Sequence, residues 1–197
     1  LFEAAGEPLP VATWTWDDLR EKAKRLTRVE DGQTTRHGFA YEPNMWWRLW
    51  VWQNEADLFD DTFNPTRCTL DTAAAAQAVQ YLADLTNVDR STPPFEDQLT
   101  SLQIADLFRS DRLAMAFGNH AVVPALAEAT SLRWNVVGLP RGQVKANLAG
   151  GAGYAISAQS HNKEAAWRFL QFLEGPKGQA LFAESGLVVP ARRSVGR

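Results

Sequence analysis

The sequence lacks the residues and motifs on which most enzymatic and metal chemistry depends. Its 197 residues include one cysteine and three histidines, and the histidines lie far apart. One cysteine cannot form an internal disulfide, and scattered histidines do not supply the clustered ligands of a transition-metal site. Motifs of serine hydrolases, P-loop proteins, zinc proteases and dithiol oxidoreductases are also missing. We therefore expect no catalytic residue, no metal and no cofactor.

Two further absences limit the partners of the chain. The formal net charge is -3 at pH 7, so the basic surface that nucleic acids require is not indicated. No apolar run of about 18 residues is present, so no membrane-spanning helix is expected. Hydrophobic residues make up 45% of the chain and charged residues 22%, which is ordinary for a globular protein.

The single cysteine and the acidic stretch near it are interpreted as structural. Cys68 lies in a strand-like stretch without an activating base nearby in the sequence, so we expect a buried, unreactive thiol. Residues 55–61 are acidic, but they lack the spacing of an EF-hand. A solvated loop is expected there rather than a calcium site.

Helical and strand-like patterns mix without strict alternation, which indicates an α/β or α+β fold. Thr15 and Asp18 have the spacing of a capping box at a helix start. Helices are predicted over residues 15–27, 44–54, 71–85, 98–109, 121–129, 163–173 and 177–185. Strands are predicted over residues 37–41, 113–117, 134–139 and 148–156, with a small hairpin over 58–61 and 67–70.

Tryptophan is unusually frequent, and half of it is concentrated in one short segment. Of eight tryptophans, four (Trp46, Trp47, Trp50 and Trp52) fall within seven residues of a predicted helix, close to Tyr41. A core could use one or two of these rings, but four exceed the usual need of packing. We expect at least one of them in a ligand pocket, although core packing remains the alternative for each.

Two other segments are candidates for ligand contact. Asn119 and His120 follow a predicted strand and open a helix, a position where α/β folds bind ligands. Asn119 could equally be only a helix N-cap. Gly150 and Gly151 lie in a predicted apolar strand, where glycine indicates either close approach of a ligand or a bend or bulge.

Seven segments occur in an order that resembles a known family. They are LFEAAG with TWDDLREKAKRLT, MWWRLWVW, LFDD before TLDTAAAAQAVQYLADL, LFRSDRLAMAFGN, WNVVGLPRG, LAGGAGYAIS, and NKEAAWRFLQFLEGPKGQALFAESGLVVPARRS. Together they resemble the extracellular solute-binding proteins of carbohydrate ABC importers, the group that includes maltose-binding protein. The resemblance covers nearly the whole chain.

The resemblance implies two α/β lobes that close over a ligand, of which this chain is mainly the C-terminal lobe. The implied fold is a periplasmic-binding-protein-like type II lobe, α/β, with a mixed sheet flanked by helices. Residues 1–150 would form the lobe, 151–190 a crossover strand and two helices that in relatives pack on the other lobe, and 191–197 a tail. An apolar face with Phe169, Leu170 and Leu173 would then lack its usual partner, so we expect self-association or rearrangement through 151–190.

The resemblance also implies a function and a set of contacts. The ligand would be a mono- or oligosaccharide, delivered to an ABC permease in the membrane. The protein would be periplasmic or extracellular, anchored as a lipoprotein in its full-length form. The implied ligand-binding residues are Tyr41, Glu42, Asn44, Trp46, Trp47, Asn119, His120, Gly150 and Gly151.

Departures from the family pattern leave the sugar open. The turn that often holds a tryptophan reads GNHAVV, and Glu55-Ala56 stands where Gly-Gly is frequent. One alternative is a glycan hydrolase that uses Glu42 with Asp57 or Asp60, but nothing in the sequence fixes the separation that such a pair needs. Another is an interaction module with the tryptophans in a protein interface.

Overall fold

The fold consists of two compact units. A computed structural model describes residues 1–95, 99–186 and 188–196, without the side chains of Asn44 and Met45. Unit 1 comprises Leu1–Gly118 and Ala129–Leu148, and unit 2 comprises Asn119–Glu128 and Ala149–Arg197. Each unit is described by itself.

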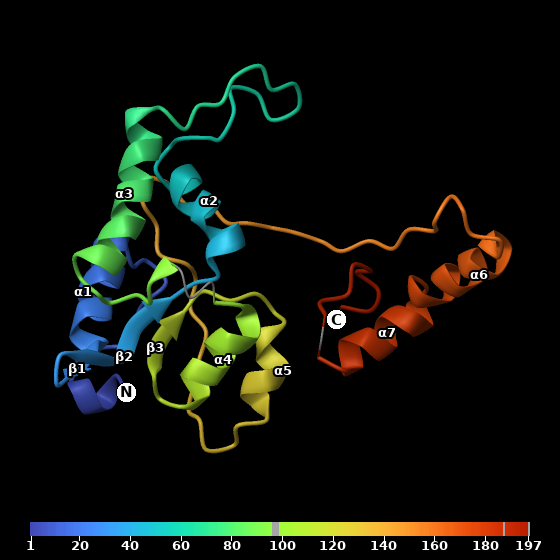
Figure 1. The fold of residues 1–197 in the computed structure, drawn as a ribbon. Coiled ribbons are helices and arrows are strands. Elements are labelled where there is room, and N and C mark those ends of the chain that lie inside the picture. The colour runs from blue at the N-terminus through green and yellow to red at the C-terminus, as the bar shows by residue number, and fades with distance from the viewer. Residues whose placement is uncertain (96–98, 187, 197) are drawn as a thin grey trace. The chain divides into compact units, whose positions relative to one another are not determined.

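Unit 1 contains most of the regular structure (Figure 1). Its elements in chain order are η1 (Glu3–Ala5), α1 (Trp16–Leu26), β1 (Arg28–Glu30), β2 (Gln33–Ala40), α2 (Pro43–Gln53), α3 (Ala73–Asn87), α4 (Ser101–Arg109) and β3 (Leu113–Ala116). The helices of unit 2 are α5 (Val122–Ala127), α6 (Lys163–Leu173) and α7 (Pro176–Glu184). Every predicted helix is present, with ends that differ by a few residues from the prediction.

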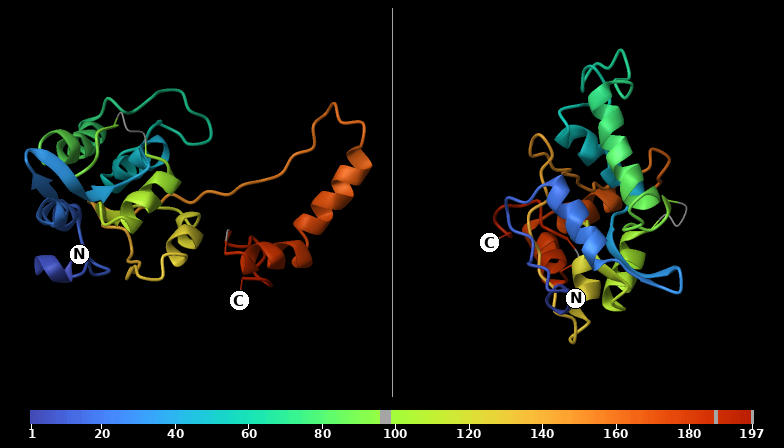
Figure 2. Two further views of the ribbon diagram at one scale, coloured as in Figure 1. Left: turned by 60° about the horizontal axis from the view of Figure 1, so that its bottom comes forward. Right: turned by 90° about the vertical axis from the view of Figure 1, so that its left-hand side faces the viewer.

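The strands form a mixed three-stranded sheet in the order β1-β2-β3. β1 and β2 are antiparallel, whereas β2 and β3 are parallel, with His37 opposite Leu113 and Phe39 opposite Met115. Helix α1 packs against β2, and α4 packs against β3 (Figure 2). The predicted mixed sheet with flanking helices is confirmed, although the sequence did not indicate β1.

Helix α1 is fixed at its start and along its buried face. The Thr15 hydroxyl accepts a hydrogen bond from the Asp18 N–H, and the Asp18 carboxylate accepts one from the Thr15 N–H, which completes the predicted capping box. Leu19 and Ala23 are fully buried. A Cβ on Gly38 of β2 would lie 1.8 Å from the carbonyl oxygen of Ala23, so glycine is required for this close packing.

Two of the predicted strands are absent. Residues 134–139 and 148–156 have no strand structure. The return segment, residues 138–148, instead bonds to backbone outside the sheet: Arg141 N–H donates to Trp14 O, and Val144 N–H donates to Gln53 O. Apolar sequence alone does not make a strand, because a strand needs a neighbouring strand to pair with.

The predicted hairpin in the loop between α2 and α3 is present in a short form. Phe59 and Cys68 form an antiparallel bridge, Asp60 N–H donates to Arg67 O, and Thr69 N–H donates to Leu58 O. The Asp60 carboxylate accepts hydrogen bonds from the Thr66 hydroxyl and from the N–H groups of Arg67 and Thr66, which hold the Asp60 pKa well below its usual value. Cys68 is exposed, so the prediction of a buried thiol is wrong: the hairpin that carries it is exposed throughout residues 59–68.

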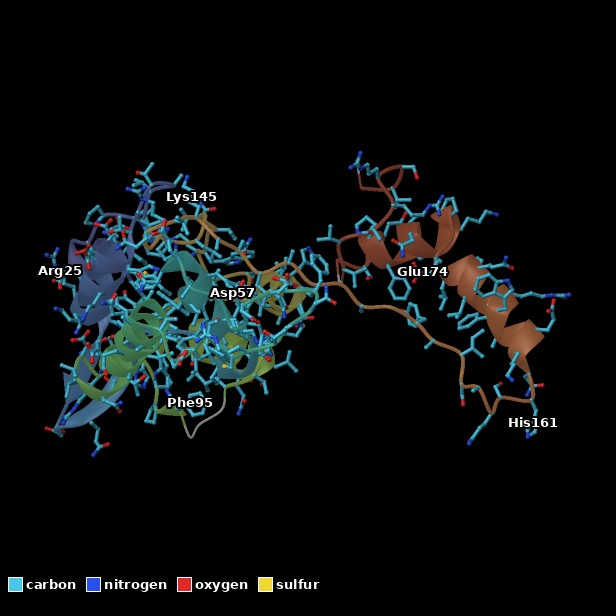
Figure 3. All side chains as sticks on the ribbon, turned by 90° about the horizontal axis from the view of Figure 1, so that it is seen from above. Arg25, Asp57, Phe95, Lys145, His161 and Glu174 are labelled. Atoms are coloured by element: carbon cyan, nitrogen blue, oxygen red, sulfur yellow. The ribbon has the colours of Figure 1, made fainter. Side chains whose placement is uncertain are left out.

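Unit 2 packs few side chains within itself. Its two long helices meet tightly where a Cβ on Gly178 would lie 2.4 Å from the carbonyl oxygens of Phe172 and Leu173. Helix α6 has no buried residue, and Trp167 and Phe169 are 54% and 60% exposed. Figure 3 shows side chains crowded together in unit 1 and standing apart along α6. In the described part of the chain, none of the helices has the length and hydropathy needed to cross a bilayer.

Candidate functional site

The parallel strands bring several predicted site residues to one edge of the sheet in unit 1. Because β2 and β3 run in the same direction, their carboxyl ends lie together, and Phe117 N–H donates to Ala40 O at 2.9 Å. Tyr41 and Glu42 leave β2 at this edge, beside Phe117. Open α/β sheets bind ligands at the carboxyl ends of their strands, so this edge is the candidate site.

Tyr41 places a phenol at this edge of the sheet. Its ring stacks on Phe39 with centroids 6.0 Å apart, and the residue is 9% exposed. Burial raises the pKa of Tyr41 to about 12, so the phenol is neutral at physiological pH and able to donate a hydrogen bond. Its hydroxyl makes no hydrogen bond with any described residue.

Glu42 is a half-buried carboxylate that one hydrogen bond positions. Its Oε2 accepts a hydrogen bond of 2.8 Å from the hydroxyl of Ser101, the first residue of α4. The remaining lone pairs of the carboxylate are available to hydroxyl donors. Helix α4 therefore orients an acceptor at the edge of the sheet.

The two carboxylates proposed as hydrolase partners of Glu42 form hydrogen bonds with other residues instead. Asp57 Oδ1 accepts a hydrogen bond of 2.9 Å from the Trp52 indole N–H. Asp60 is bonded to backbone and to Thr66 within its own loop. A glycosidase needs two carboxyl groups facing one bond, and no hydrogen bond or ring contact links either residue to Glu42 in the part of the chain that the structure describes.

The four clustered tryptophans have different environments, and two are core residues. Trp50 is fully buried and stacks on Phe117 at 5.4 Å and on Tyr81 at 5.2 Å. Trp46 is 7% exposed and meets Phe117 edge-on at 6.4 Å. Core packing therefore accounts for all of the surface of Trp50 and for most of the surface of Trp46.

Trp47 and Trp52 retain exposed surface. Both are half-buried, and the Arg48 guanidinium lies 6.0 Å from the Trp47 ring. The buried indole N–H groups of Trp46 and Trp50 have no hydrogen-bond partner. Of the four rings, only Trp47 and Trp52 therefore keep surface that a ligand could contact, and the Trp52 N–H is already bonded to Asp57.

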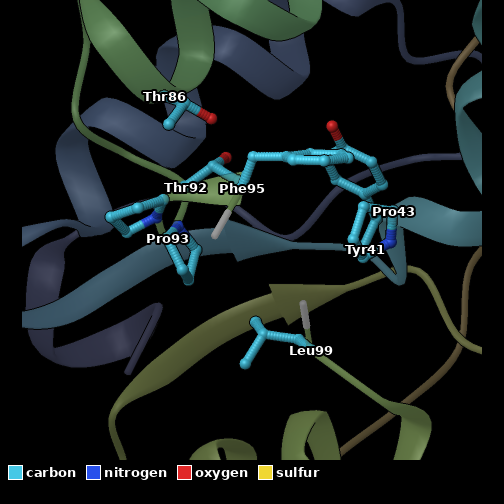
Figure 4. Close-up of a pocket in the computed structure, with 8 residues that line it drawn as sticks. Tyr41, Pro43, Thr86, Thr92, Pro93, Phe95 and Leu99 are labelled. Carbon is cyan, nitrogen blue, oxygen red and sulfur yellow. The ribbon is translucent and has the colours of Figure 1, made fainter. Parts of the chain in front are cut away.

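A small pocket opens beside Tyr41 (Figure 4). It has about 270 Å³ of empty space, including its open mouth, and none of the four clustered tryptophans lines it. Its lining residues come from the end of β2, the end of α3 and the loop that follows α3, and they include Tyr41, Pro43, Thr86, Thr92, Pro93 and Phe95. Of these lining residues, only Tyr41 was among the predicted ligand contacts.

The other predicted site residues belong to unit 2 and are exposed. Asn119 Oδ1 accepts a hydrogen bond of 2.9 Å from the Ala121 N–H, but the N-cap of α5 is Ala121, so Asn119 forms a turn before the helix rather than its cap. His120 is exposed next to it. A Cβ on Gly150 or Gly151 would have no atom within 4 Å, so these glycines are not explained by close backbone packing. The side chain of Asn44 lies outside the described residues.

Solved structures share this fold. An ABC substrate-binding protein from Listeria monocytogenes in complex with cycloalternan is 21% identical with a TM-score of 0.81, over 100% of this chain and 50% of that chain. An ABC transporter solute-binding protein from Thermotoga lettingae bound with alpha-D-tagatose is 22% identical with a TM-score of 0.85, over 98% and 50%. A solute-binding protein from Agrobacterium radiobacter in complex with ribitol is 25% identical with a TM-score of 0.72, over 94% and 47%.

The chain spans about half the length of these structures. No curated protein matches it in sequence. The profile of one protein family, described as bacterial extracellular solute-binding protein, matches residues 1–197, the whole chain. The chain therefore belongs to the family of bacterial extracellular solute-binding proteins.

Proposed function

We propose that this chain forms part of a receptor that binds a sugar or polyol and delivers it to an ABC importer. The observation that carries the proposal is the sheet edge of unit 1, where the Glu42 carboxylate and the unpartnered Tyr41 phenol lie next to each other in sequence, in a chain of a solute-binding family. The similar structures hold cycloalternan, tagatose and ribitol, all of which are rich in hydroxyl groups.

The chemistry of this edge suits a polyhydroxylated solute. The Glu42 carboxylate accepts hydrogen bonds from hydroxyls, and the Tyr41 phenol both donates and accepts. The part of Trp47 that remains exposed provides apolar surface for the C–H groups of a sugar ring. Asn119, His120, Gly150, Gly151 and Asn44 remain predicted ligand contacts. Binding of this kind needs no catalytic residue.

We further propose that the rest of the receptor lies in sequence outside this chain. The chain spans half the length of the similar structures, and α6 leaves Trp167, Phe169 and Phe172 exposed within unit 2. A second lobe would cover this face in the full-length protein. Without it, self-association through residues 151–190 is the expected result. The full-length protein would act outside the cytoplasm as a lipid-anchored partner of the permease.

Calorimetric titration of the full-length protein with D-glucose, maltose, D-tagatose and ribitol tests the proposal. We expect saturable one-to-one binding of at least one of these solutes, with a change in tryptophan fluorescence. Glu42→Gln should weaken binding about tenfold, because a charged acceptor is replaced by a neutral one. Release of new reducing ends from maltose would instead support the hydrolase, and binding of none of the four would overturn the proposal.

A further inference from the structure

One buried hydroxyl in unit 1 is left without a partner at the wall of the pocket. Thr92 is 5% exposed, lines the pocket, and its Oγ1 has no hydrogen-bond partner. The neighbouring Ser91 is fully buried, and its hydroxyl donates to Leu85 O at 3.2 Å. The two adjacent hydroxyls therefore differ. The Ser91 hydroxyl bonds a backbone carbonyl, whereas the Thr92 hydroxyl is available to a ligand.

The backbone around Thr92 is fixed, so its hydroxyl is held in place. Phe39 N–H of β2 donates to Ser91 O at 3.1 Å, and Thr92 N–H donates to Leu85 O at 3.3 Å. These bonds attach the loop after α3 to the edge of β2, beside the strand end that carries Tyr41. A buried hydroxyl without a partner is unfavourable, and valine would fill the same space without that cost. Packing alone does not explain a threonine here.

The rest of the pocket has the composition of a small-ligand subsite. Its walls are mainly proline and aromatic carbon, from Pro43, Pro93 and Phe95. The second unpartnered hydroxyl, that of Tyr41, belongs to another lining residue. The enclosed part of the pocket is about the size of one water molecule, so it has room for a single hydroxyl or hydroxymethyl group rather than for a whole sugar ring.

We propose that this pocket receives one hydroxyl or hydroxymethyl group of the solute, with the Thr92 and Tyr41 hydroxyls as its hydrogen-bond partners. The inference rests on the proposed function and names residues that would set its specificity. A solute hydroxyl would displace a water molecule and restore the bonds which that water makes. Solutes that lack a group at this position would bind more weakly, because the buried Thr92 hydroxyl would then be left without a partner.

The test uses the full-length protein and calorimetric titration with D-glucose, maltose, D-tagatose and ribitol, followed by variants with each solute that binds. Thr92→Val and Tyr41→Phe should each raise Kd about tenfold, and Thr92→Ser should stay within about twofold of wild type. Without solute, the melting temperature of Thr92→Val should be equal to or above that of wild type, because a hydroxyl without a partner has been removed.

Tyr81→Phe is the matched control. The Tyr81 hydroxyl donates to Trp16 O at 2.5 Å inside the core, so this variant should lower the melting temperature and leave Kd unchanged. Unchanged Kd values for Thr92→Val and Tyr41→Phe, with a wild type that binds, would overturn this inference alone. A lower melting temperature for Thr92→Val with unchanged Kd would do the same, since it would show a structural hydroxyl. A wild type that binds none of the four solutes would overturn the proposed function as well.

Discussion

Unit 1 and unit 2 contain similar apolar side chains but use them differently. In unit 1, Phe39, Leu49 and Trp50 are fully buried around one aromatic cluster. In unit 2, α6 has no buried residue, and its Trp167 is 54% exposed. An amphipathic helix is stable in water only when its apolar face is covered. Unit 1 therefore supplies its own core, whereas the helices of unit 2 present a surface suited to packing on something else.

The largest contrast should appear when one tryptophan is removed from each unit. Trp50→Ala in unit 1 should lower the free energy of unfolding by about 3–5 kcal/mol, because it empties a fully buried site. Trp167→Ala in unit 2 should change it by less than about 0.5 kcal/mol in the 197-residue chain. Urea unfolding followed by circular dichroism measures both, and equal losses would contradict the contrast.

Glycine substitutions sharpen the same comparison. Gly38→Ala should cost about 3 kcal/mol, because the new Cβ would overlap the carbonyl oxygen of Ala23. Gly150→Ala, at a position with open space around it, should cost less than about 0.5 kcal/mol. Thermal unfolding of the two variants is the measurement. A mild effect of Gly38→Ala would mean that α1 is free to move away from β2.

Two buried glutamines allow a smaller test of hydrogen bonding. Gln53 accepts from the Trp16 indole and donates to Ala146 O, and it is 1% exposed. Gln53→Leu should cost about 2 kcal/mol, because both partners lose a buried bond. Gln179 of unit 2 bonds the exposed Glu174 and the Ala191 N–H, so Gln179→Leu should cost about 1 kcal/mol or less. Chemical unfolding should rank them in this order, and the reverse ranking would contradict a stabilising role of the Gln53 bonds to Trp16 and to the return segment.

The smallest effect is a dependence of stability on pH that originates in unit 1. The hydrogen bond from Lys22 lowers the pKa of Glu7 below 4.5, and Arg25 acts in the same direction. This contribution is fully present above pH 4.5 and is lost as the pH falls through the folded pKa. Glu7→Gln should flatten the stability profile below pH 4.5. Glu164→Gln, which removes an exposed ion pair of α6 with Arg168, should leave the wild-type profile unchanged.

Sequence patterns identified the helices better than the strands. The capping box at Thr15 and the apolar periodicity of α3 and α6 depend on residues a few positions apart, so they can be read directly. The predicted strands over 134–139 and 148–156 failed for the opposite reason. A strand exists only if a distant segment pairs with it, and the return segment bonds to Trp14 and Gln53 instead.

The candidate site was predicted in part. Tyr41 and Glu42 were selected, and the structure places both at the carboxyl edge of the sheet. Trp46 was also selected, but it is largely buried, as is its neighbour Trp50. Counting indoles does not tell which of them face the core. Thr92 was missed, because a single threonine before two prolines has no periodicity or spacing that distinguishes it from any other loop residue.

The sequence by itself determined the family, the helices and the absence of the short motifs that mark common enzymes. Those properties follow from local order and residue identity along the chain. Only the tertiary structure decided that Trp50 fills the core, that Cys68 is exposed and that the Thr92 hydroxyl lacks a partner. Burial and hydrogen-bond pairing depend on which distant segments meet, and that is fixed by packing in three dimensions.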